Sequence, residues 1–472
     1  MATDPRGLRE DAPLLDAWLT FQEQQPTPFT IPGHKHRTDL VGDVITGDVP
    51  LYAGLDTMKL GAGVLIEAEA RAARLWGADL CRFSTGGATH ANQAIALAVA
   101  GDGDEVVVSR TLHRSMLLGL VLAGLTPVWV RPEVDAATGL PLGVAPATVR
   151  RALDEHPRAK AVFVGDPSYV GTVGDITGLA AAAQDHDLPL IVDAAWAAHF
   201  GFHPDLPPHA IQLGADAVVT SAHKTLPAWS QAALVLARTK RIDPARLEAG
   251  VEATATTSPA GAILASTDAA RALLERDGPS LLGPAIDATR AARDRLHAIE
   301  GLVVLDGPSV DPLKLTLLLR GTGVDGNAVE QDLLGAGLPV ESADRDVIVA
   351  IVTLANTTDD LDALATAIES SIERRRGQAR PAASAAIYAV DPIVAMAPRQ
   401  AFFAEREVVA IERAIGRIST ELIAPYPPGI PVLAPGERIT NDTIAALGRA
   451  RDAGVRIAYA ADPTLASLIV AR

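Results

Sequence analysis

Lys224 is the residue of this 472-residue sequence with the clearest capacity for covalent chemistry. It follows an apolar run that ends in Ser221, Ala222 and His223. Burial at the end of a strand disfavours the ammonium form of a lysine, and the resulting neutral amine can form an imine with an aldehyde. Ser221 and His223 are spaced to point donors toward one anion, for which phosphate is the obvious candidate. The segment therefore predicts an imine-forming lysine beside a phosphate site.

The sequence has six lysines, so each can be weighed individually. Lys160, Lys240 and Lys314 lie in polar or strand-edge contexts, which are typical of solvated surface lysines. We interpret these three as surface charges. Lys224 is thereby left as the strongest candidate for a reactive amine.

Asp193 ends a second apolar run, Leu188–Asp193, one strand–helix–strand excursion before Lys224. A carboxylate at a strand end is often only a helix cap. In a pyridoxal 5'-phosphate (PLP) site, however, a carboxylate keeps the pyridine nitrogen protonated, so that the ring can accept electrons. We expect Asp193 and Lys224 at one edge of a sheet.

Two further features strengthen the same interpretation. The small residues of Ser84–Thr89 precede a helical pattern. The free N–H groups at the start of a helix can bind phosphate. A Gly-Gly turn by itself is more often an ordinary turn. His113 follows the next strand pattern, where an imidazole could lie flat on an aromatic ring, although a single histidine is usually a surface or core residue. All four features in this order predict PLP as a Schiff base on Lys224.

Composition limits the classes of partner. The formal net charge of −16 disfavours nucleic acid, because phosphate backbones bind basic surfaces. The acidic field would attract cationic substrates, although solubility alone is the more ordinary explanation. The single cysteine, Cys81, excludes an intrachain disulfide and a cysteine zinc cluster, and its setting indicates a buried strand residue. We expect no metal, no membrane span and, from the absence of an apolar signal core, a cytoplasmic protein.

Helical patterns alternate with short β-branched runs from about Ala62 onward, which predicts an α/β fold with a mostly parallel sheet. The expected strands are Glu105–Ser109, Thr126–Arg131, Ala161–Gly165, Leu188–Asp193, Ala217–Ser221 and Ala232–Leu236. A smaller α/β domain should follow, with a helix over Ala285–Ile299. The predicted divisions are an N-terminal segment (1–60), a PLP-binding large domain (61–270), a small α/β domain (271–376), a linker (377–386) and a C-terminal segment (387–472).

The sequence resembles the Orn/Lys/Arg decarboxylase family of fold-type I (aspartate aminotransferase-like) PLP enzymes, and most of all its short bacterial arginine decarboxylase-like members. The similar segments span nearly the whole chain in the family order. They are Phe29–Arg37, Gly54–Ala78, Ser84–Asn92, Ser109–Ser115, Asp166–Ile176, Val192–Phe202, Ser221–Gln231, Thr256–Pro259 and Ala424–Thr440. The combination of PGHK, SxHKTL and YPPGIPxxxPGE is highly specific.

The resemblance implies that Lys224 carries the Schiff base, Asp193 pairs with the pyridine nitrogen and His113 stacks on the ring. The residues implied to hold the rest of the cofactor are Ala195 beneath the ring, Ser221, His223, Gly87, Ala88 and Thr89 at the phosphate, and Thr256 and Thr257 at the cofactor of a neighbouring subunit. The family forms dimers with shared sites, so we expect a homodimer or a higher homo-oligomer.

The resemblance also implies substrate contacts. Glu437 is expected at the distal cationic group of the substrate, with a helix-capping or surface acid as the alternative. His34 and Lys35 either line the entrance or hold the N-terminal segment. The family pattern Asp-Glu-Ala-His-Gly-Ala-His is changed over Asp193–His199, where Trp196 and His199 are further substrate candidates.

The expected reaction is decarboxylation of a basic amino acid to its amine and CO2, as in polyamine biosynthesis, with the α-carbon reprotonated by Lys224 or His223. Arginine is favoured, and lysine or ornithine come next. Two alternatives stay open. The same scaffold hosts aminotransferases and lyases, and the altered Asp193–His199 segment is also compatible with a catalytically weakened regulatory relative.

Overall fold

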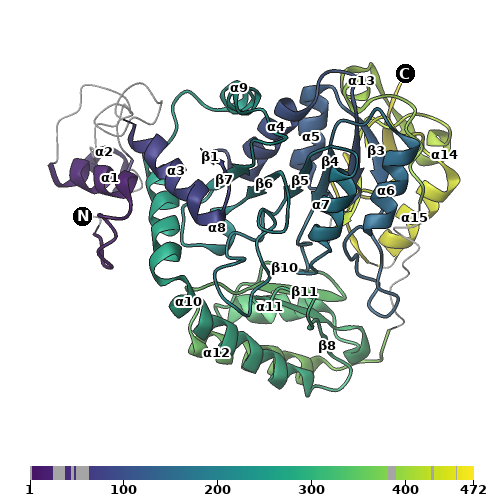
Figure 1. The fold of residues 1–472 in the computed structure, drawn as a ribbon. Helices are drawn as coiled ribbons and strands as arrows, with labels where there is room; N and C mark the ends of the chain where they lie inside the picture. Colours follow the sequence, from purple (N-terminus) through teal and green to yellow (C-terminus); the bar gives the residue numbers. More distant parts are fainter. Residues whose placement is uncertain are drawn as a thin grey trace. The chain divides into compact units, whose positions relative to one another are not determined.

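The computed structural model describes residues 3–24, 38–43, 47–48, 63–380, 390–426, 430–452 and 454–472. His34, Lys35 and most of the predicted linker lie outside these ranges. The chain divides into two compact units, Met1–Val99 with Ile191–Leu281 and Ala100–Leu190 with Leu282–Arg472. Each unit is built from segments far apart in the sequence, as the colours of Figure 1 show.

The first unit contributes four strands to a seven-stranded sheet, and Figure 1 draws them side by side. Their order is β1 (Leu80–Ser84), β7 (Ala233–Ala237), β6 (Ala217–Thr220) and β5 (Leu190–Asp193). β5 and β6 are parallel, whereas β7 is antiparallel to both of its neighbours. Every residue of β5, β6 and β7 is buried. Continuous apolar runs are what strands covered on both faces require.

Helices cover the strands of this unit. α4 (Gly87–Val99) packs on β6, β7 and α9 (Pro244–Thr254), while α3 (Val64–Trp76) packs on β1. Close packing of α4 on α9 needs Gly250, because a side chain there would clash with the backbone of α4. The remaining helices are α1 (Pro13–Gln24), α2 (Thr38–Val41), α8 (Ala222–Thr225) and the first part of α10 (Gly261–His297).

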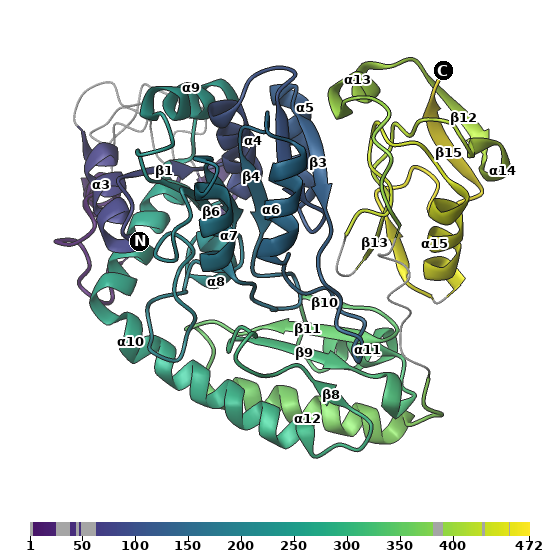
Figure 2. The same cartoon turned by 45° about the vertical axis from the view of Figure 1, so that its right-hand side comes forward.

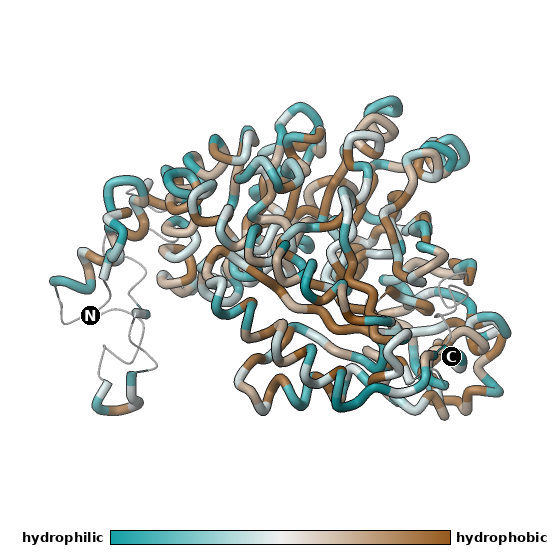
Figure 3. The backbone as a smooth tube through the Cα atoms, turned by 90° about the horizontal axis from the view of Figure 1, so that it is seen from below, coloured by the Kyte–Doolittle hydropathy of each residue, from teal (hydrophilic) through white to brown (hydrophobic). Residues whose placement is uncertain are grey.

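The second unit contributes three parallel strands in the order β4 (Val162–Gly165), β2 (Glu105–Ser109) and β3 (Thr126–Val130). Their connecting helices are α5 (Arg114–Ala123), α6 (Pro146–Glu155) and α7 (Ile176–Gln184). α6 and α7 pack on each other. In Figure 3 hydrophobic stretches of the chain, drawn in brown, alternate with hydrophilic turns, drawn in teal.

A separate four-stranded antiparallel sheet also belongs to the second unit. Its order is β10 (Ser342–Ala343), β11 (Val347–Ile351), β9 (Lys314–Leu318) and β8 (Val303–Val304), with α11 (Gly326–Gly335), α12 (Thr358–Arg375) and the 3-10 turn η2 (Arg320–Thr322). Lys314 corrects the sequence interpretation, because it is only 1% exposed and not a surface lysine. Gly171 makes room for its stem, since a Cβ at that left-handed glycine would lie 2.7 Å from Lys314 Cγ.

The C-terminal part holds two small antiparallel sheets, β12 with β15 and β13 with β14. Figure 2 shows β12 and β15 paired, with α15 nearby. Buried residues of α15 and β15, such as Leu447 and Leu468, share one apolar core. The elements are α13 (Pro398–Phe403), β12 (Arg406–Ala410), α14 (Ile411–Ala414), β13 (Ala424–Tyr426), α15 (Asn441–Asp452), β14 (Arg456–Ala458) and β15 (Ser467–Ala471).

The predicted fold class is confirmed: the chain is α/β with a mostly parallel sheet, a smaller domain and a C-terminal part. The six expected strands are present, and that over Glu105–Ser109 has the predicted bounds. The helix expected over Ala285–Ile299 is the end of the longer α10. The predicted linker begins with a hydrogen-bonded residue, since the N–H of Gly377 donates to the Thr322 carbonyl at 3.1 Å. The domain bounds themselves stay a prediction.

A buried ion pair attaches the N-terminal helix α1 to α10. Asp268 and Arg271 have side chains that are 0% and 1% exposed and lie 2.7 Å apart. Asp268 accepts the N–H of Leu14 at 2.9 Å, and Arg271 donates to the carbonyl of Asp11. Loss of the arginine would leave a buried carboxylate without its counter-charge, which is a costly arrangement.

We therefore expect Arg271→Ala to lower the free energy of unfolding by roughly 3–5 kcal/mol in urea denaturation. Arg290→Ala is the matched control, because Arg290 forms the same i, i+3 pair with Asp287 on α10 but both side chains are more than half exposed. The control should cost less than about 1 kcal/mol. Equal losses in the two variants would contradict the assignment.

Candidate active site

Lys224 lies in the short helix α8, directly after β6. The parallel register of β5 and β6 pairs Asp193 with Val219, which is two residues before Ser221. The carboxyl ends of parallel strands open at one sheet edge, so the two predicted segments share that edge. The ammonium nitrogen of Lys224 lies 3.8 Å from the ring centroid of Trp196. The side chain is half-buried, as a reactive amine with access to a ligand requires.

Asp193 is held in a fixed orientation. It is 7% exposed, its Oδ2 accepts Asn92 Nδ2 at 2.7 Å, and its Oδ1 accepts the N–H of Ala195 at 3.3 Å. Within the described residues no arginine, lysine or histidine forms an ion pair with it. A buried carboxylate normally has a cationic partner. A protonated ring nitrogen of a bound cofactor would provide one.

Asn92 was not predicted as a site residue. It lies one turn into α4, at the end of the sequence segment that also carries the glycine turn. Its distance from Asp193 along the chain hid the contact, although its burial on an otherwise alanine-rich helix face would have been a usable signal.

The turn before α4 has the shape of an anion site. Gly87 has φ +68°, which favours glycine, and its N–H donates to the Gln231 carbonyl at 2.8 Å. A side chain at Gly86 would lie 2.7 Å from His90 Cβ, so glycine is required there as well. The N–H groups of Ala88 and Thr89 belong to the first turn of α4, where no intrahelical acceptor exists. They are available to a phosphate.

Ser221 and Thr225 bring two buried hydroxyl groups to the α8 segment. Neither oxygen has a hydrogen-bond partner among the described residues, and Ser221 is 0% exposed. An unsatisfied buried hydroxyl costs about 1–3 kcal/mol. The donor chemistry and this unused capacity fit a bound phosphate group.

His223 has its ring nitrogens in different roles. Nδ1 lies 2.9 Å from the Ala232 carbonyl, which can only accept, so Nδ1 carries a proton. The backbone N–H of His223 donates to the same carbonyl at 3.2 Å. Nε2 is therefore the nitrogen that can meet a ligand or transfer a proton.

The carbonyls of Gln231 and Ala232 connect the glycine turn before α4 with α8, and the sequence did not predict this connection. The Gln231 carbonyl accepts from Gly87, and the next carbonyl accepts from His223. Gln231 has φ +77°, a left-handed conformation that costs a non-glycine residue free energy. This strained turn sets the glycine turn against α8.

His113 belongs to the second unit, where it is exposed and caps α5. Its Nδ1 accepts the N–H of Ser115 at 3.2 Å and lies 2.8 Å from Ser115 Oγ. These contacts orient the ring. The end of β4 abuts this turn, because a Cβ on Gly165 would lie 3.3 Å from the Thr111 carbonyl oxygen.

Asp166 follows Gly165 and was not predicted as a site residue. It is 7% exposed, and it accepts the N–H of Gly174 at 2.6 Å. Burial raises the pKa of this carboxyl to about 7, and the Gly174 hydrogen bond opposes the rise. This carboxyl lies at a strand end beside the His113 turn and has the raised pKa that is typical of functional sites.

The remaining predicted residues have varied surroundings. Ala195 is half-buried after Asp193, whereas Thr256 and Thr257 are exposed beyond α9. Thr256 Oγ1 accepts the N–H of Ser258 at 3.2 Å.

His199 is 1% exposed, and its ring contacts Phe200 edge-on. Burial, and in second place the charge of His199, lowers the pKa of nearby His209 to about 3.

Glu437 lies in the second unit and is 2% exposed. Both of its oxygens accept hydrogen bonds from Arg110. Contact with the distal group of a substrate, as the sequence predicts, would therefore have to replace or extend this pair.

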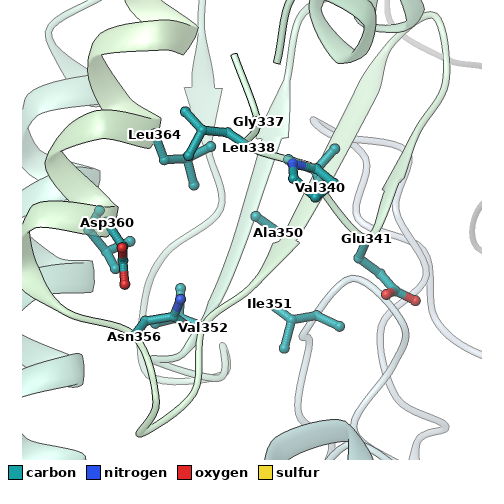
Figure 4. Close-up of a pocket in the computed structure, with 12 residues that line it drawn as sticks. Gly337, Leu338, Val340, Glu341, Ala350, Ile351, Val352, Asn356, Asp360 and Leu364 are labelled. Carbon is teal, nitrogen blue, oxygen red and sulfur yellow. The ribbon is translucent and has the colours of Figure 1, made fainter. Parts of the chain in front are cut away.

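A pocket of about 540 Å³ lies in the small domain, between β11 and α12. Figure 4 shows Leu338, Val340 and Asp360 among the residues around it. No predicted site residue lines it. The described parts of the chain contain no group of three or more His, Cys, Asp or Glu side chains placed to hold a metal, and no helix in them is long and apolar enough to cross a membrane.

Comparison with known proteins identifies the family. Residues 12–306 match the Orn/Lys/Arg decarboxylase major domain, and residues 381–450 match the Orn/Lys/Arg decarboxylase C-terminal domain. The chain belongs to the Orn/Lys/Arg decarboxylase family. It is 32% identical over 475 residues to the arginine decarboxylase of Bacillus subtilis (strain 168), covering 97% of both chains.

Solved structures support the fold of this decarboxylase family member. Lysine decarboxylase A from Pseudomonas aeruginosa superimposes with a TM-score of 0.82 at 22% identity, over 98% of this chain and 81% of that one. A structure described as SPT with PLP matches with a TM-score of 0.53 at 18% identity, over 66% of this chain and 76% of that one. Both similarities concern the fold.

The raised pKa of Asp166 predicts a pH-dependent stability. Between about pH 4 and pH 7 the folded state keeps a proton that the unfolded state has released, so the free energy of unfolding falls as pH rises through this window, by up to about 1.4 kcal/mol per pH unit. Asp166→Asn does not titrate and should flatten the loss of melting temperature between pH 5 and pH 8. Asp175→Asn, at an exposed helix cap in the same loop, is the control and should keep the wild-type profile.

Proposed function

We propose that this chain decarboxylates a basic amino acid, with arginine first and lysine or ornithine next, using PLP bound to Lys224. The observation that carries the proposal is the buried Asp193 carboxylate, fixed by Asn92 at the sheet edge that also bears Ser221 and Lys224. Family membership and the arginine decarboxylase relatives support the reaction class.

PLP, when bound, supplies an electron sink for the bond that breaks at the substrate α-carbon. Lys224 would hold the group covalently through its amine, and Asp193 would keep a proton on the pyridine nitrogen. Ser221, His223 and the N–H groups of Ala88 and Thr89 would bind the phosphate, and Gly87, whose own N–H is held by the Gln231 carbonyl, would shape the turn. His113 and Ala195 are the residues that would contact the pyridine ring.

The protein residues would also manage the proton that replaces the carboxyl group. In decarboxylation the bond from the α-carbon to the carboxylate breaks, CO2 leaves, and one proton is added at the α-carbon. Lys224, whose nitrogen lies over the Trp196 ring, is one candidate donor. His223 is the other candidate, through Nε2, since Nδ1 is committed to the Ala232 carbonyl.

Substrate preference and assembly belong to the same proposal. The net charge of −16 favours approach of cationic substrates. Trp196 and His199 are the proposed substrate contacts, whereas both oxygens of Glu437, the other residue expected there, accept from Arg110. Thr256 and Thr257 are exposed on a turn, as residues reaching a partner subunit's cofactor in a homodimer must be. The amine product would enter polyamine biosynthesis, and a cytoplasmic location stays a sequence-based prediction.

The role of Lys224 is tested by Lys224→Ala. The purified variant should lack the visible absorbance band of a lysine imine and should lose CO2 release by at least about a thousandfold, because it loses both the covalent attachment and a proton donor. Lys240→Ala removes an exposed lysine of the same unit and should leave both signals unchanged. A visible band and full CO2 release in Lys224→Ala would refute the assignment.

The substrate is tested by measuring CO2 release across amino acids, with each product identified by mass. Arginine should give CO2 and agmatine at the highest kcat/KM. A keto acid product without CO2 would favour an aminotransferase. Purified protein without a PLP absorbance band, even after incubation with PLP, would instead favour a regulatory relative, for which the altered Asp193–His199 segment is the motivating observation.

A further inference from the structure

Arg110 occupies a nearly closed site at the end of β2. It is 5% exposed, and its guanidinium lies 4.7 Å from the ring centroid of Trp129. Nε donates to the Pro431 carbonyl at 2.8 Å, and both terminal nitrogens donate to Glu437. A guanidinium group is suited to such a site, because its planar fork can bind a carboxylate and a carbonyl together.

Three of the roughly four acceptor positions of the Glu437 carboxylate are occupied by groups of the described residues. One oxygen pairs with Arg110, and the other accepts from Arg110 at 2.8 Å and from the N–H of Ala434 at 2.8 Å. Its backbone is equally committed, since its carbonyl accepts the N–H of Ser419 at 2.8 Å and it bridges Val394. Glu437 therefore connects several segments of the C-terminal part with Arg110.

The chain from Arg110 to His113 is short and rigid. The N–H of Leu112 donates to the Ser109 carbonyl at 3.2 Å, and the hydroxyl groups of Ser109 and Thr111 lie 2.6 Å apart. A displacement of Arg110 would therefore be passed to His113 three residues later.

Arg114 makes a second contact on the other side of His113. Its guanidinium lies 5.1 Å from the ring centroid of Tyr459, which comes from the C-terminal part. Tyr459 has φ +69°, a conformation that tyrosine rarely adopts. The candidate ring-stacking histidine is thus flanked by two arginines, and the C-terminal part contacts both.

We infer that the C-terminal part positions the His113 turn through Arg110 and Arg114, and that Glu437 is a positioning residue that acts through Arg110. The catalytic meaning of this inference rests on the proposed function of His113. The Glu437 carboxylate already accepts three hydrogen bonds, two of them from an arginine that is itself buried, which favours a positioning role over direct contact with a substrate.

The chain offers a matched control. Arg131 and Asp391 form another ion pair between the β3 segment and the C-terminal part, at 3.1 Å, but their side chains are 41% and 81% exposed. Solvent screens such a pair, so its loss should have little effect. Glu437→Gln and Asp391→Asn each convert one carboxylate to an amide of the same shape.

The first measurement is hydrogen–deuterium exchange of the full chain, read at the peptide covering residues 109–116. Glu437→Gln and Arg110→Lys should each raise its exchange rate about tenfold or more, and Asp391→Asn should not. This readout needs no cofactor, so it stays valid if the proposed function fails. Unchanged exchange in both Arg110 and Glu437 variants would overturn the inference.

The second measurement is a double-variant cycle on steady-state kinetics. Arg110→Lys and Glu437→Gln should each lower kcat on the order of tenfold with little change of KM, and the double variant should be no worse than either single one, because both break the same link. Arg114→Ala should lower kcat less, since a partly exposed stacking contact is weaker.

One kinetic result would overturn the positioning role. If Glu437→Gln raises KM for a basic substrate but leaves kcat unchanged, and if Arg110→Lys changes neither parameter, then Glu437 contacts the substrate. The visible circular dichroism of bound PLP provides a further readout. It should change in Arg110→Lys and Glu437→Gln, whereas the visible absorbance band of the imine on Lys224 should persist. If the wild-type protein itself shows no such absorbance band, that result counts against the proposed function and not against this inference.

Discussion

The parallel pairing of β5 with β6 is the constraint on which the site depends. Both strands are buried throughout and apolar up to their last residues, Asp193 and Thr220, so their polar groups appear only where the strands end. The register places Asp193 beside Val219, and the next turn carries Ser221 to Lys224. One hydrogen-bonded pair of strands thereby brings together an acid and an amine 31 positions apart in the sequence.

Around this pair the protein keeps polar groups that its own structure does not satisfy. The hydroxyls of Ser221 and Thr225 have no partner among the described residues, Asp193 has no ion pair there, and Gln231 holds a left-handed conformation. Each of these features costs free energy in the folded chain. The proposed cofactor would supply the anion and the protonated nitrogen that these groups lack.

Arginine, rather than lysine, makes the long-range connections. The chain has six lysines among 41 basic residues, and Arg110, Arg271 and Arg380 each bind acceptors from distant segments through several nitrogens. A lysine in the same position would offer a single point charge. Arg271 thereby holds the N-terminal segment on α10, and Arg110 holds the C-terminal part at the end of β2.

The sequence by itself determined the α/β class and the strands, and it singled out Lys224, Asp193 and the glycine turn as the predicted site, because strand burial, turn geometry and amine chemistry all depend on local residue patterns. Only the tertiary structure decided which side chains complete the site. Asn92 meets Asp193 across 101 positions, and Arg110 meets Glu437 across 327. Burial of Asp166 and Lys314 likewise follows from the packing of separate segments. A local pattern indicates which face a residue occupies, whereas its partner is set by whichever distant segment packs against that face.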